Sequence, residues 1–170
     1  MIDRRLFLAT AIATTALPLP AHSKATAMNK RFKQFSAVID AWKRKDVDFI
    51  INSMTDDIVW HYAAAVAPPA RGKAECRAFI SKFGANIGTV RWRIFEHAET
   101  ADRLFAEGVD EYDTLDGHTI KAPYAGVIEF RGDLIKGWRD YVDRSVIDAQ
   151  KRGEAASPQV NELTSRKAAQ

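Results

Sequence analysis

The sequence predicts an α+β fold in which three helices from the N-terminal half of the chain close a pocket against a cone-shaped, strongly curved mixed β-sheet. Three observations support this prediction. Apolar residues between positions 32 and 50 repeat with the period of a helix, whereas those from position 89 onward alternate with the period of a strand. Asp-Gly and Gly-Asp pairs separate the later strands, which is typical of consecutive hairpins. A run of helices followed by a run of strands is typical of α+β proteins, whose helices pack on one face of the sheet.

The composition fits a single globular domain. The chain has 170 residues, 46% of them hydrophobic, which is enough for a substantial core. Lys and Arg number 25 against 22 Asp and Glu, and this small excess is not gathered into a basic stripe with interleaved aromatics, so nucleic acid is not expected as a partner. Cys76 is the single cysteine, which excludes an internal disulfide and favours a buried apolar role for this residue.

The N-terminus resembles a twin-arginine export signal. Arg4 and Arg5 precede an apolar run that extends to Leu17, and small and proline residues follow it. The run is too short to span a bilayer. We therefore expect residues 1–27 to be removed and the mature protein to be periplasmic, without a membrane segment. The alternative is a cytoplasmic chain that starts at Met28.

Three helices are expected before the long strands. The first carries one apolar stripe, formed by Phe32, Phe35, Val38, Ile39 and Trp42. A short second helix begins after Asp46, a good N-cap, and runs to Met54. The third helix covers residues 73–83 and ends at Gly84. Its inward residues are Cys76, Phe79, Ile80 and Phe83.

A strand over residues 58–62 separates the second helix from the third and places Ile58, Trp60 and Tyr62 on one face. Four long strands follow, over residues 89–97, 103–113, 119–131 and 134–143. Pro123 interrupts the third of them, where we expect a bulge or bend. Beyond residue 151 the sequence becomes polar and loses its periodicity. The domain is therefore expected to span residues 28–151, and residues 152–170 are expected to form a disordered tail.

The last predicted strand contains the first candidate for a chemical role. Alternation places Trp138, Asp140 and Val142 on one face of this strand. If that face is buried, Asp140 is a carboxylate among apolar groups, and such a group is a candidate acid or base. The alternative is that Arg139 and Asp143 form a surface pair while Asp140 caps a neighbouring group.

Four stretches of the chain together resemble a known family. They are Glu107 to Tyr112, Leu115 to His118, Pro123 to Glu129 and Gly137 to Asp143. They are similar to the limonene-1,2-epoxide hydrolase-like and SnoaL-like proteins of the nuclear transport factor 2-like superfamily, which also includes ketosteroid isomerase. The resemblance covers residues 32 to about 151. It implies a cone-shaped domain with a deep apolar pocket, two carboxylates at its floor, and no metal or organic cofactor.

The resemblance also implies roles for particular residues. Asp140 would be the base that activates water, and Asp110 the acid that protonates an epoxide oxygen. Two carboxyl groups in one apolar pocket cannot both ionise cheaply, so one can donate a proton while the other accepts one. The family's bridging arginine is replaced by Gly108, which predicts a raised pKa for both aspartates. Its water-holding tyrosine and asparagine are replaced by Trp60 and Tyr62.

An aromatic pocket of this kind suits a small apolar, aromatic or terpenoid substrate. Besides the catalytic candidates Asp140, Asp110 and Tyr62, the residues expected to contact the substrate are Trp60, Trp138, Tyr112, Gly108 and Val142. Trp92 and Tyr124 are either further lining residues or plain core. The histidines do not have the spacing of metal ligands, so no metal site is predicted.

Three classes of function remain open on the sequence alone. The first is a cofactor-free epoxide hydrolase. The second is a lyase, isomerase or cyclase in which Tyr62 stabilises a developing oxyanion. The third is a non-enzymatic ligand-binding module. A homodimer is also expected, paired through the outer sheet face that carries Arg91, Arg93, Phe95, Arg139 and Tyr141.

Overall fold

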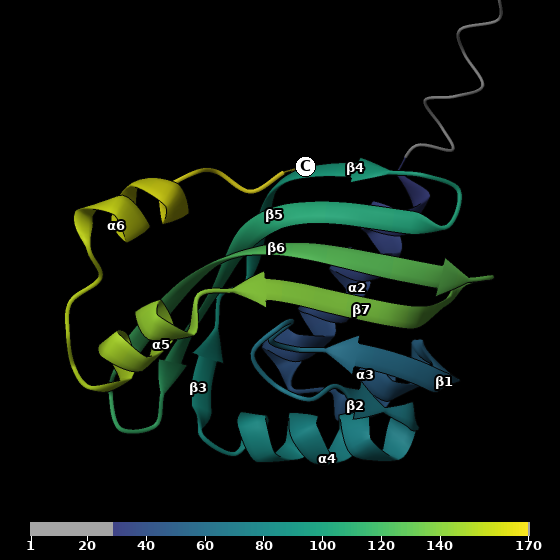
Figure 1. The fold of residues 1–170 in the computed structure, drawn as a ribbon, viewed down its shortest axis with the longest axis horizontal. Coiled ribbons are helices and arrows are strands. Elements are labelled where there is room, and N and C mark those ends of the chain that lie inside the picture. The colour runs from purple at the N-terminus through teal and green to yellow at the C-terminus, as the bar shows by residue number, and fades with distance from the viewer. Residues whose placement is uncertain (1–28, 170) are drawn as a thin grey trace, which may run out of the picture.

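Residues 29–169 of the computed structural model are described here, and in this range a seven-stranded mixed sheet curls around a hydrophobic core (Figure 1). The strand order is β2-β1-β7-β6-β5-β3, and β4 also pairs with β5. Strand β1 runs parallel to β7, and the other paired strands are antiparallel. The strands are β1 Met54–His61, β2 Ala70–Arg71, β3 Ile87–Val90, β4 Arg93–Glu99, β5 Arg103–Thr114, β6 Thr119–Arg131 and β7 Leu134–Val142. The α+β fold with a strongly curved mixed sheet is confirmed.

The helices of the N-terminal half pack against the concave side of this sheet and follow their sequence signals. They are α2 Lys30–Arg44, α3 Val47–Asn52 and α4 Gly72–Gly84. Helix α2 buries most of the predicted apolar stripe, with Phe32 half-buried. The predicted cap Asp46 accepts a hydrogen bond of 3.0 Å from the Phe49 N–H at the start of α3. At the start of α2, the backbone N–H groups of Lys30 and Phe32 donate hydrogen bonds to the carboxylate of Glu99, which lies in β4.

The predicted strand over residues 89–97 is divided into β3 and β4. The division lies at Arg91 and Trp92, although the Arg91 N–H still donates to the carbonyl of Glu111 in β5. A register shift between Ile94 and Glu96 also marks a bulge in β4. Bulges bend a strand and increase its twist, so this edge contributes to the curvature of the sheet.

The sequence predicts a bulge or a bend at Pro123, and a bulge is absent from the β5–β6 ladder. Val109 pairs with Pro123 in an unbroken register that runs from one end of β5 to the other. On the other edge of β6, the β7 ladder ends where Tyr124 pairs with Val142. No β7 residue is therefore paired with Pro123, and the missing proline N–H does not interrupt that ladder.

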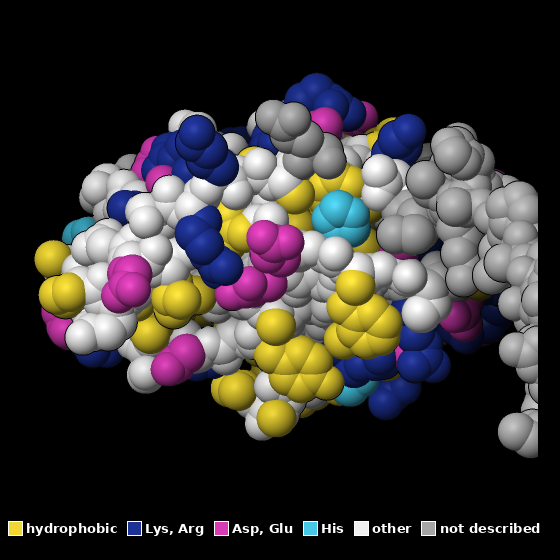
Figure 2. Space-filling view, turned by 90° about the horizontal axis from the view of Figure 1, so that it is seen from above, with side chains coloured by type: hydrophobic (Ala, Val, Ile, Leu, Met, Phe, Trp, Pro, Cys, Tyr) yellow, Lys and Arg dark blue, Asp and Glu magenta, His cyan; other side chains and the backbone are white. Residues whose placement is uncertain are grey.

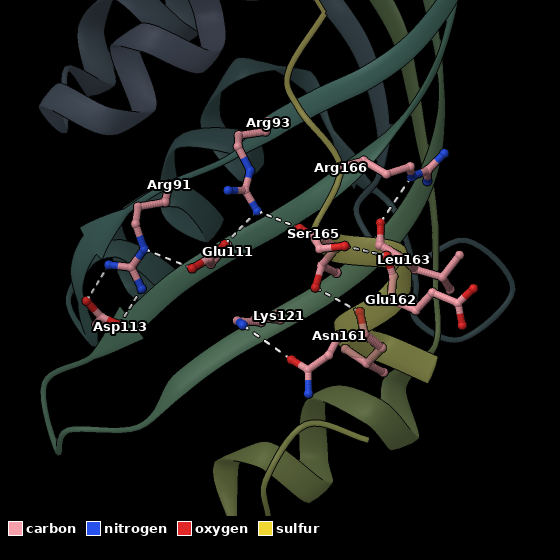
Figure 3. A network of polar contacts seen from close by, with 12 residues as sticks. Arg91, Arg93, Glu111, Asp113, Lys121, Asn161, Glu162, Leu163, Ser165 and Arg166 are labelled. Atoms are coloured by element: carbon pink, nitrogen blue, oxygen red, sulfur yellow. Dashed lines mark hydrogen bonds and ion pairs between the residues drawn. The ribbon is translucent and has the colours of Figure 1, made fainter. Parts of the chain in front are cut away.

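The expected disordered tail is also wrong for much of its length. Strand β7 is followed by helix α5, Arg144–Lys151, and then by helix α6, Pro158–Thr164. Ser157 caps α6 by accepting from the Val160 N–H, and Val160 is buried. The segment after α6 reaches strand β4, where the Ala169 N–H donates to Ile94 O at 2.7 Å. This segment is therefore held in place mainly by polar contacts (Figure 3) and by a few buried apolar side chains.

The C-terminal segment covers part of the face assigned to dimerisation. The Arg166 guanidinium lies 4.6 Å from the ring centre of Phe95, and Phe95 is only 5% exposed. Tyr141 on the same outer face remains 50% exposed. On the face of the molecule seen in Figure 2, basic and acidic side chains are interspersed with hydrophobic ones among the residues drawn in colour. The homodimer stays a prediction.

Two sequence expectations concern the N-terminus and the membrane. The expected export signal, residues 1–27, lies outside the described residues. Within the described range, none of the helices is long and apolar enough to cross a membrane.

Candidate active site

A pocket of about 140 Å³ opens between the concave sheet face and the helices. Inward-facing residues of β1, β5, β6 and β7 form its floor, because alternate side chains of each strand point to the same side. Most of the wall is aromatic or aliphatic. The lining consists of Trp42, Trp60, Tyr62, Phe79, Phe83, Ile87, Val90, Trp92, Asp110, Tyr112, Tyr124, Asp140, Val142, Arg144, Ile147 and Lys151.

Asp140 is held at this floor by two indole groups. Trp138 Nε1 donates to Asp140 Oδ1 at 2.7 Å, and Trp60 Nε1 donates to Asp140 Oδ2 at 3.3 Å. The two indole rings stack with centres 4.7 Å apart, because Trp60 and Trp138 are direct partners in the parallel β1–β7 ladder. Burial raises the pKa of Asp140 to about 7, against the lowering effect of both indole donors.

This arrangement excludes the alternative reading of the strand as a surface pair. Arg139 donates instead to Glu129 at 2.7 Å, across the β6–β7 ladder on the outer face. Asp143 caps helix α5 by accepting from the Ser145 N–H at 2.8 Å. Asp140 is only 9% exposed and faces the pocket.

Asp110 faces the same pocket from β5, in different surroundings. It lies opposite Ala122 in the β5–β6 ladder and is partly buried. Among the described residues, no side chain or backbone N–H donates a hydrogen bond to its carboxyl group, and no hydrogen bond joins it to Asp140. Burial alone raises the pKa of Asp110 to about 7, and the charge of Asp110 further raises the pKa of Asp140.

Tyr124 and Trp92 add two buried polar groups to the site. They are 5% and 7% exposed, and within residues 29–169 neither Tyr124 Oη nor Trp92 Nε1 has a hydrogen-bond partner. The two groups are close enough for Trp92 to lower the pKa of Tyr124, although their geometry falls outside that of a hydrogen bond. Burial, followed by the charges of Asp140 and Asp110, raises the pKa of Tyr124 far above its usual value. The phenol therefore lies within electrostatic reach of both carboxyl groups.

Two glycines make the room for this tyrosine. A Cβ atom at Gly108 would lie 3.0 Å from Tyr124 Cε1, and one at Gly126 would lie 3.2 Å from Tyr124 Cε2. The Gly126 position would also approach Asp140 Oδ1 to 3.3 Å. The Tyr124 ring and the Asp140 carboxyl group therefore fit at this position only because Gly108 and Gly126 have no side chains.

The structure corrects two of the expected substrate contacts. Gly108 does not line the pocket, and a side chain there would collide with the backbone, because its Cβ would lie 2.2 Å from Arg93 O. Trp138 is fully buried and supports Asp140 from behind instead of lining the pocket. Trp60, Tyr112 and Val142 do line it. The positions of these residues are described by the structure, whereas their functional roles remain proposals.

Tyr62 lies in the wall and stacks on Phe79, with ring centres 4.0 Å apart. It also borders an adjoining cavity of about 380 Å³ that shares Phe79, Phe83, Tyr112 and other lining residues with the inner pocket. Tyr62 is therefore placed toward the wider part of the site. Within residues 29–169, no cluster of three or more His, Cys, Asp or Glu side chains has an arrangement that could hold a metal ion.

Helix α5 contributes lining residues that the sequence analysis missed entirely. Arg144, Ile147 and Lys151 occupy positions i, i+3 and i+7 of this helix, so they share the face that turns toward the pocket. The signal that could have identified the helix was Asp143 as its N-cap, followed by this short periodic pattern.

Comparison with known proteins agrees with the observed fold. A model of the SnoaL-like domain family matches residues 35–138. No curated protein matches the chain by sequence. Among solved structures, an LEH-like epoxide hydrolase of M. tuberculosis is 20% identical, with a TM-score of 0.63 over 74% of this chain and 92% of that protein. A putative SnoaL-like polyketide cyclase from Shewanella denitrificans OS-217 is 13% identical, with a TM-score of 0.64 over 72% and 97% of the two chains.

A third similar structure is a hypothetical protein with a ketosteroid isomerase-like fold from Catenulispora acidiphila DSM 44928, in complex with trimethylamine. It is 21% identical, with a TM-score of 0.64 over 73% of this chain and 95% of that protein. At these identities the similarities establish a shared fold.

Proposed function

The chain belongs to the SnoaL-like domain family, and from that premise we propose that it is a cofactor-independent acid–base enzyme acting on a small apolar or aromatic substrate. One observation carries the proposal. Asp110 and Asp140 face the same apolar pocket, and the pKa of each is raised to about 7. An acid or base is most effective when its pKa lies near the working pH, so both groups are suited to proton transfer under neutral conditions.

The surroundings of the two carboxyl groups support different roles. Two indole N–H donors favour the charged form of Asp140, whereas Asp110 lacks a donor from the described residues. Since two adjacent charges in one apolar pocket repel each other, the pair favours a single shared negative charge. We assign Asp140 as the base and the protonated Asp110 as the acid.

The first candidate reaction is the opening of an epoxide by water. Asp140 accepts a proton from water while the water oxygen attacks a ring carbon. The carbon–oxygen bond of the ring breaks, and Asp110 donates its proton to the leaving oxygen. The product is a diol, and proton exchange with solvent restores the starting state of both aspartates. Tyr124 provides an O–H group and Trp92 an N–H group that can bind the ring oxygen as it gains charge.

A second candidate, an isomerase, lyase or cyclase reaction, is favoured by a different observation. Gly108 has no room for a side chain, so an arginine cannot bridge the two carboxylates from that position as it does in the hydrolase pattern. Asp140 would then remove a proton from the substrate carbon that lies next to a carbonyl group. The resulting oxyanion would be stabilised by Tyr124, Trp92 and the protonated Asp110.

Isotope tracing separates these reactions. The protein is incubated with styrene-type and terpene-type epoxides in ¹⁸O-labelled water, and with aromatic ketones in deuterated water. Label from ¹⁸O in a diol product supports hydrolysis, and deuterium at the carbon next to the carbonyl supports the second reaction. Asp140→Asn and Asp110→Asn serve as matched inactive variants. Turnover that these two variants retain in full would overturn the proposal, and so would ligand binding without any turnover, which would identify a non-enzymatic binding module.

A further inference from the structure

The outer part of the candidate site is positively charged. The adjoining cavity of about 380 Å³ is lined by Lys82 of α4 and by Arg144 and Lys151 of α5. None of its described lining residues is acidic. The remaining lining is aromatic, apolar or neutral: Tyr62, Phe79, Phe83, Asn86, Ile87, Tyr112 and Thr114.

These cations are placed by helical periodicity. Lys82 follows Phe79 by three positions in α4, so both side chains reach the same side of that helix. Arg144 and Lys151 flank Ile147 on the pocket face of α5. The neighbouring Arg152 differs, because it donates to Glu154 and does not line either cavity.

Little of this charge is neutralised by the protein itself. Within residues 29–169, Lys82 and Lys151 take part in no ion pair. Arg144 approaches Asp148 at 3.4 Å, but both side chains are nearly half exposed, so this pair is weak. A positive region of this kind attracts anions, and the apolar walls beside it reduce the screening by water.

The carboxyl groups and the cations occupy different parts of the site. Asp110 and Asp140 line only the inner pocket and Lys82 lines only the outer cavity, whereas Arg144 and Lys151 line both. Tyr112 lines both regions: burial raises its pKa, the charge of Asp110 raises it further, and the charge of Arg144 lowers it. An anionic group would be repelled at the inner end and attracted at the outer end.

We infer that the substrate is amphiphilic: it has an apolar or aromatic body and an anionic group, such as a carboxylate, that Arg144 and Lys151 bind with help from Lys82. This inference rests on the proposed function, because it assumes that the reacting part of the same molecule enters the inner pocket. The anionic group then also orients the substrate, since the reverse orientation would place it beside Asp110 and Asp140.

Binding of two probes of nearly equal shape tests the inference without turnover. The probes are 4-biphenylcarboxylate and 4-biphenylcarboxamide, and binding to the full chain is measured by calorimetry at low salt and in about 0.5 M salt. We expect the carboxylate to bind about tenfold more tightly than the amide at low salt. High salt should remove most of this preference, because it shortens the range of interactions between exposed charges to a few Å.

Variants locate the site. Arg144→Gln combined with Lys151→Gln should weaken binding of the carboxylate to the level of the amide. Arg152→Gln removes one positive charge from a neighbouring position outside the cavity and should keep the preference. Circular dichroism confirms that each variant is folded.

The outcomes separate this inference from the proposed function. Equal binding of carboxylate and amide, or a preference that survives the double substitution, would overturn the inference whatever the enzyme catalyses. Tighter binding of 4-biphenylmethylammonium than of the carboxylate would also overturn it, because the inner aspartates would then dominate recognition. If the carboxylate preference behaves as expected but Asp140→Asn retains turnover, the anion site stands and the proposed chemistry fails.

Discussion

The two faces of strand β5 place the same kind of side chain in opposite chemical states. Asp110, on the inner face, has a pKa raised to about 7 by burial. Asp113, three residues later on the outer face, has a pKa lowered to about 2, chiefly by Arg91, which donates to both of its oxygens at 2.6 Å. Alternation along the strand separates the two environments within about 10 Å of backbone.

On the outer face, arginines pair with the carboxylates, whereas the floor of the pocket has no arginine among its described residues. Glu111 accepts from Arg91 and Arg93 at 3.0 and 2.9 Å, and Arg93 also donates to the carbonyl of Thr164 (Figure 3). At the pocket floor, Asp140 has only two neutral indole donors. The face of the strand, and the cations that lie on it, therefore determine whether a carboxyl group is suited to proton transfer.

The largest expected effect is on catalysis. Asp140→Asn and Asp110→Asn should each lower kcat by about 10²–10⁴-fold, because each removes a proton-transfer group while keeping its shape. Asp113→Asn, on the outer face, should change kcat by less than about threefold and serves as the matched control. Steady-state kinetics on the substrate identified by isotope tracing measures this difference. An equal loss in Asp113→Asn would show that the two faces do not differ in function.

The next effect concerns stability and pH. A carboxyl group whose pKa is higher in the folded state stabilises the fold at low pH, and this contribution is lost as pH rises from about 4 to 7. Asp110→Asn removes the penalty of burying the charge and should increase the free energy of unfolding at pH 8 by up to about 4 kcal/mol. At pH 3, where Asp110 is neutral in both states, the substitution should have little effect.

Urea unfolding at the two pH values measures this change. Asp113→Asn should instead decrease the free energy of unfolding at pH 8. The lowered pKa of Asp113 gives a stabilising contribution that is present above about pH 4 and lost below about pH 2. A variant with Asn at position 110 that is less stable than the wild type at pH 8 would contradict the unfavourable burial of Asp110.

A smaller effect concerns the space on the inner face. Gly108→Ala should destabilise the protein by about 1–3 kcal/mol, because the new Cβ would lie 2.2 Å from Arg93 O and 3.0 Å from the Tyr124 ring. Gly84→Ala, in α4, meets no atom within 4 Å and should not destabilise the protein. Thermal unfolding compares the two variants. If Gly108→Ala is neutral, the close packing around Tyr124 does not constrain the site.

The smallest effect is expected on the outer face. Arg91→Gln should cost less than about 1 kcal/mol at low salt, and less still in high salt, because Arg91 is partly exposed and its ion pairs are screened by solvent. The pKa of Asp113 should rise toward its ordinary value, which NMR titration of its carboxyl carbon detects. A loss of several kcal/mol would place the outer network among the main stabilising features of the fold.

Much of the sheet could be predicted because its signals are local. The Asp116-Gly117 and Gly132-Asp133 turns define strands β5, β6 and β7 to within about two residues, and alternation places Asp140 beside Trp138. Helices α5 and α6 were missed because each buries few apolar residues, although the Ser157 cap and Pro158 at the first turn are a recognisable helix start.

The finer features of the site depend on contacts between distant segments. The bond from Trp60 to Asp140 joins residues 80 positions apart, through the parallel pairing of β1 with β7. Trp92 lies in the break between β3 and β4, where alternation does not assign it a direction. The resemblance identified both aspartates. The need for a glycine at position 108 is visible only in the structure, where Arg93 of β4 and the Tyr124 ring leave no space for a side chain.

The capping of helix α2 bears on how the protein could be processed. Asn29 makes no side-chain cap, and the N–H groups of Lys30 and Phe32 are satisfied by Glu99, at 3.1 and 2.9 Å. A carboxylate at this end also complements the positive pole of the helix. The start of helix α2 is therefore determined by a residue of β4, and cleavage of the chain before Asn29 would leave that start intact.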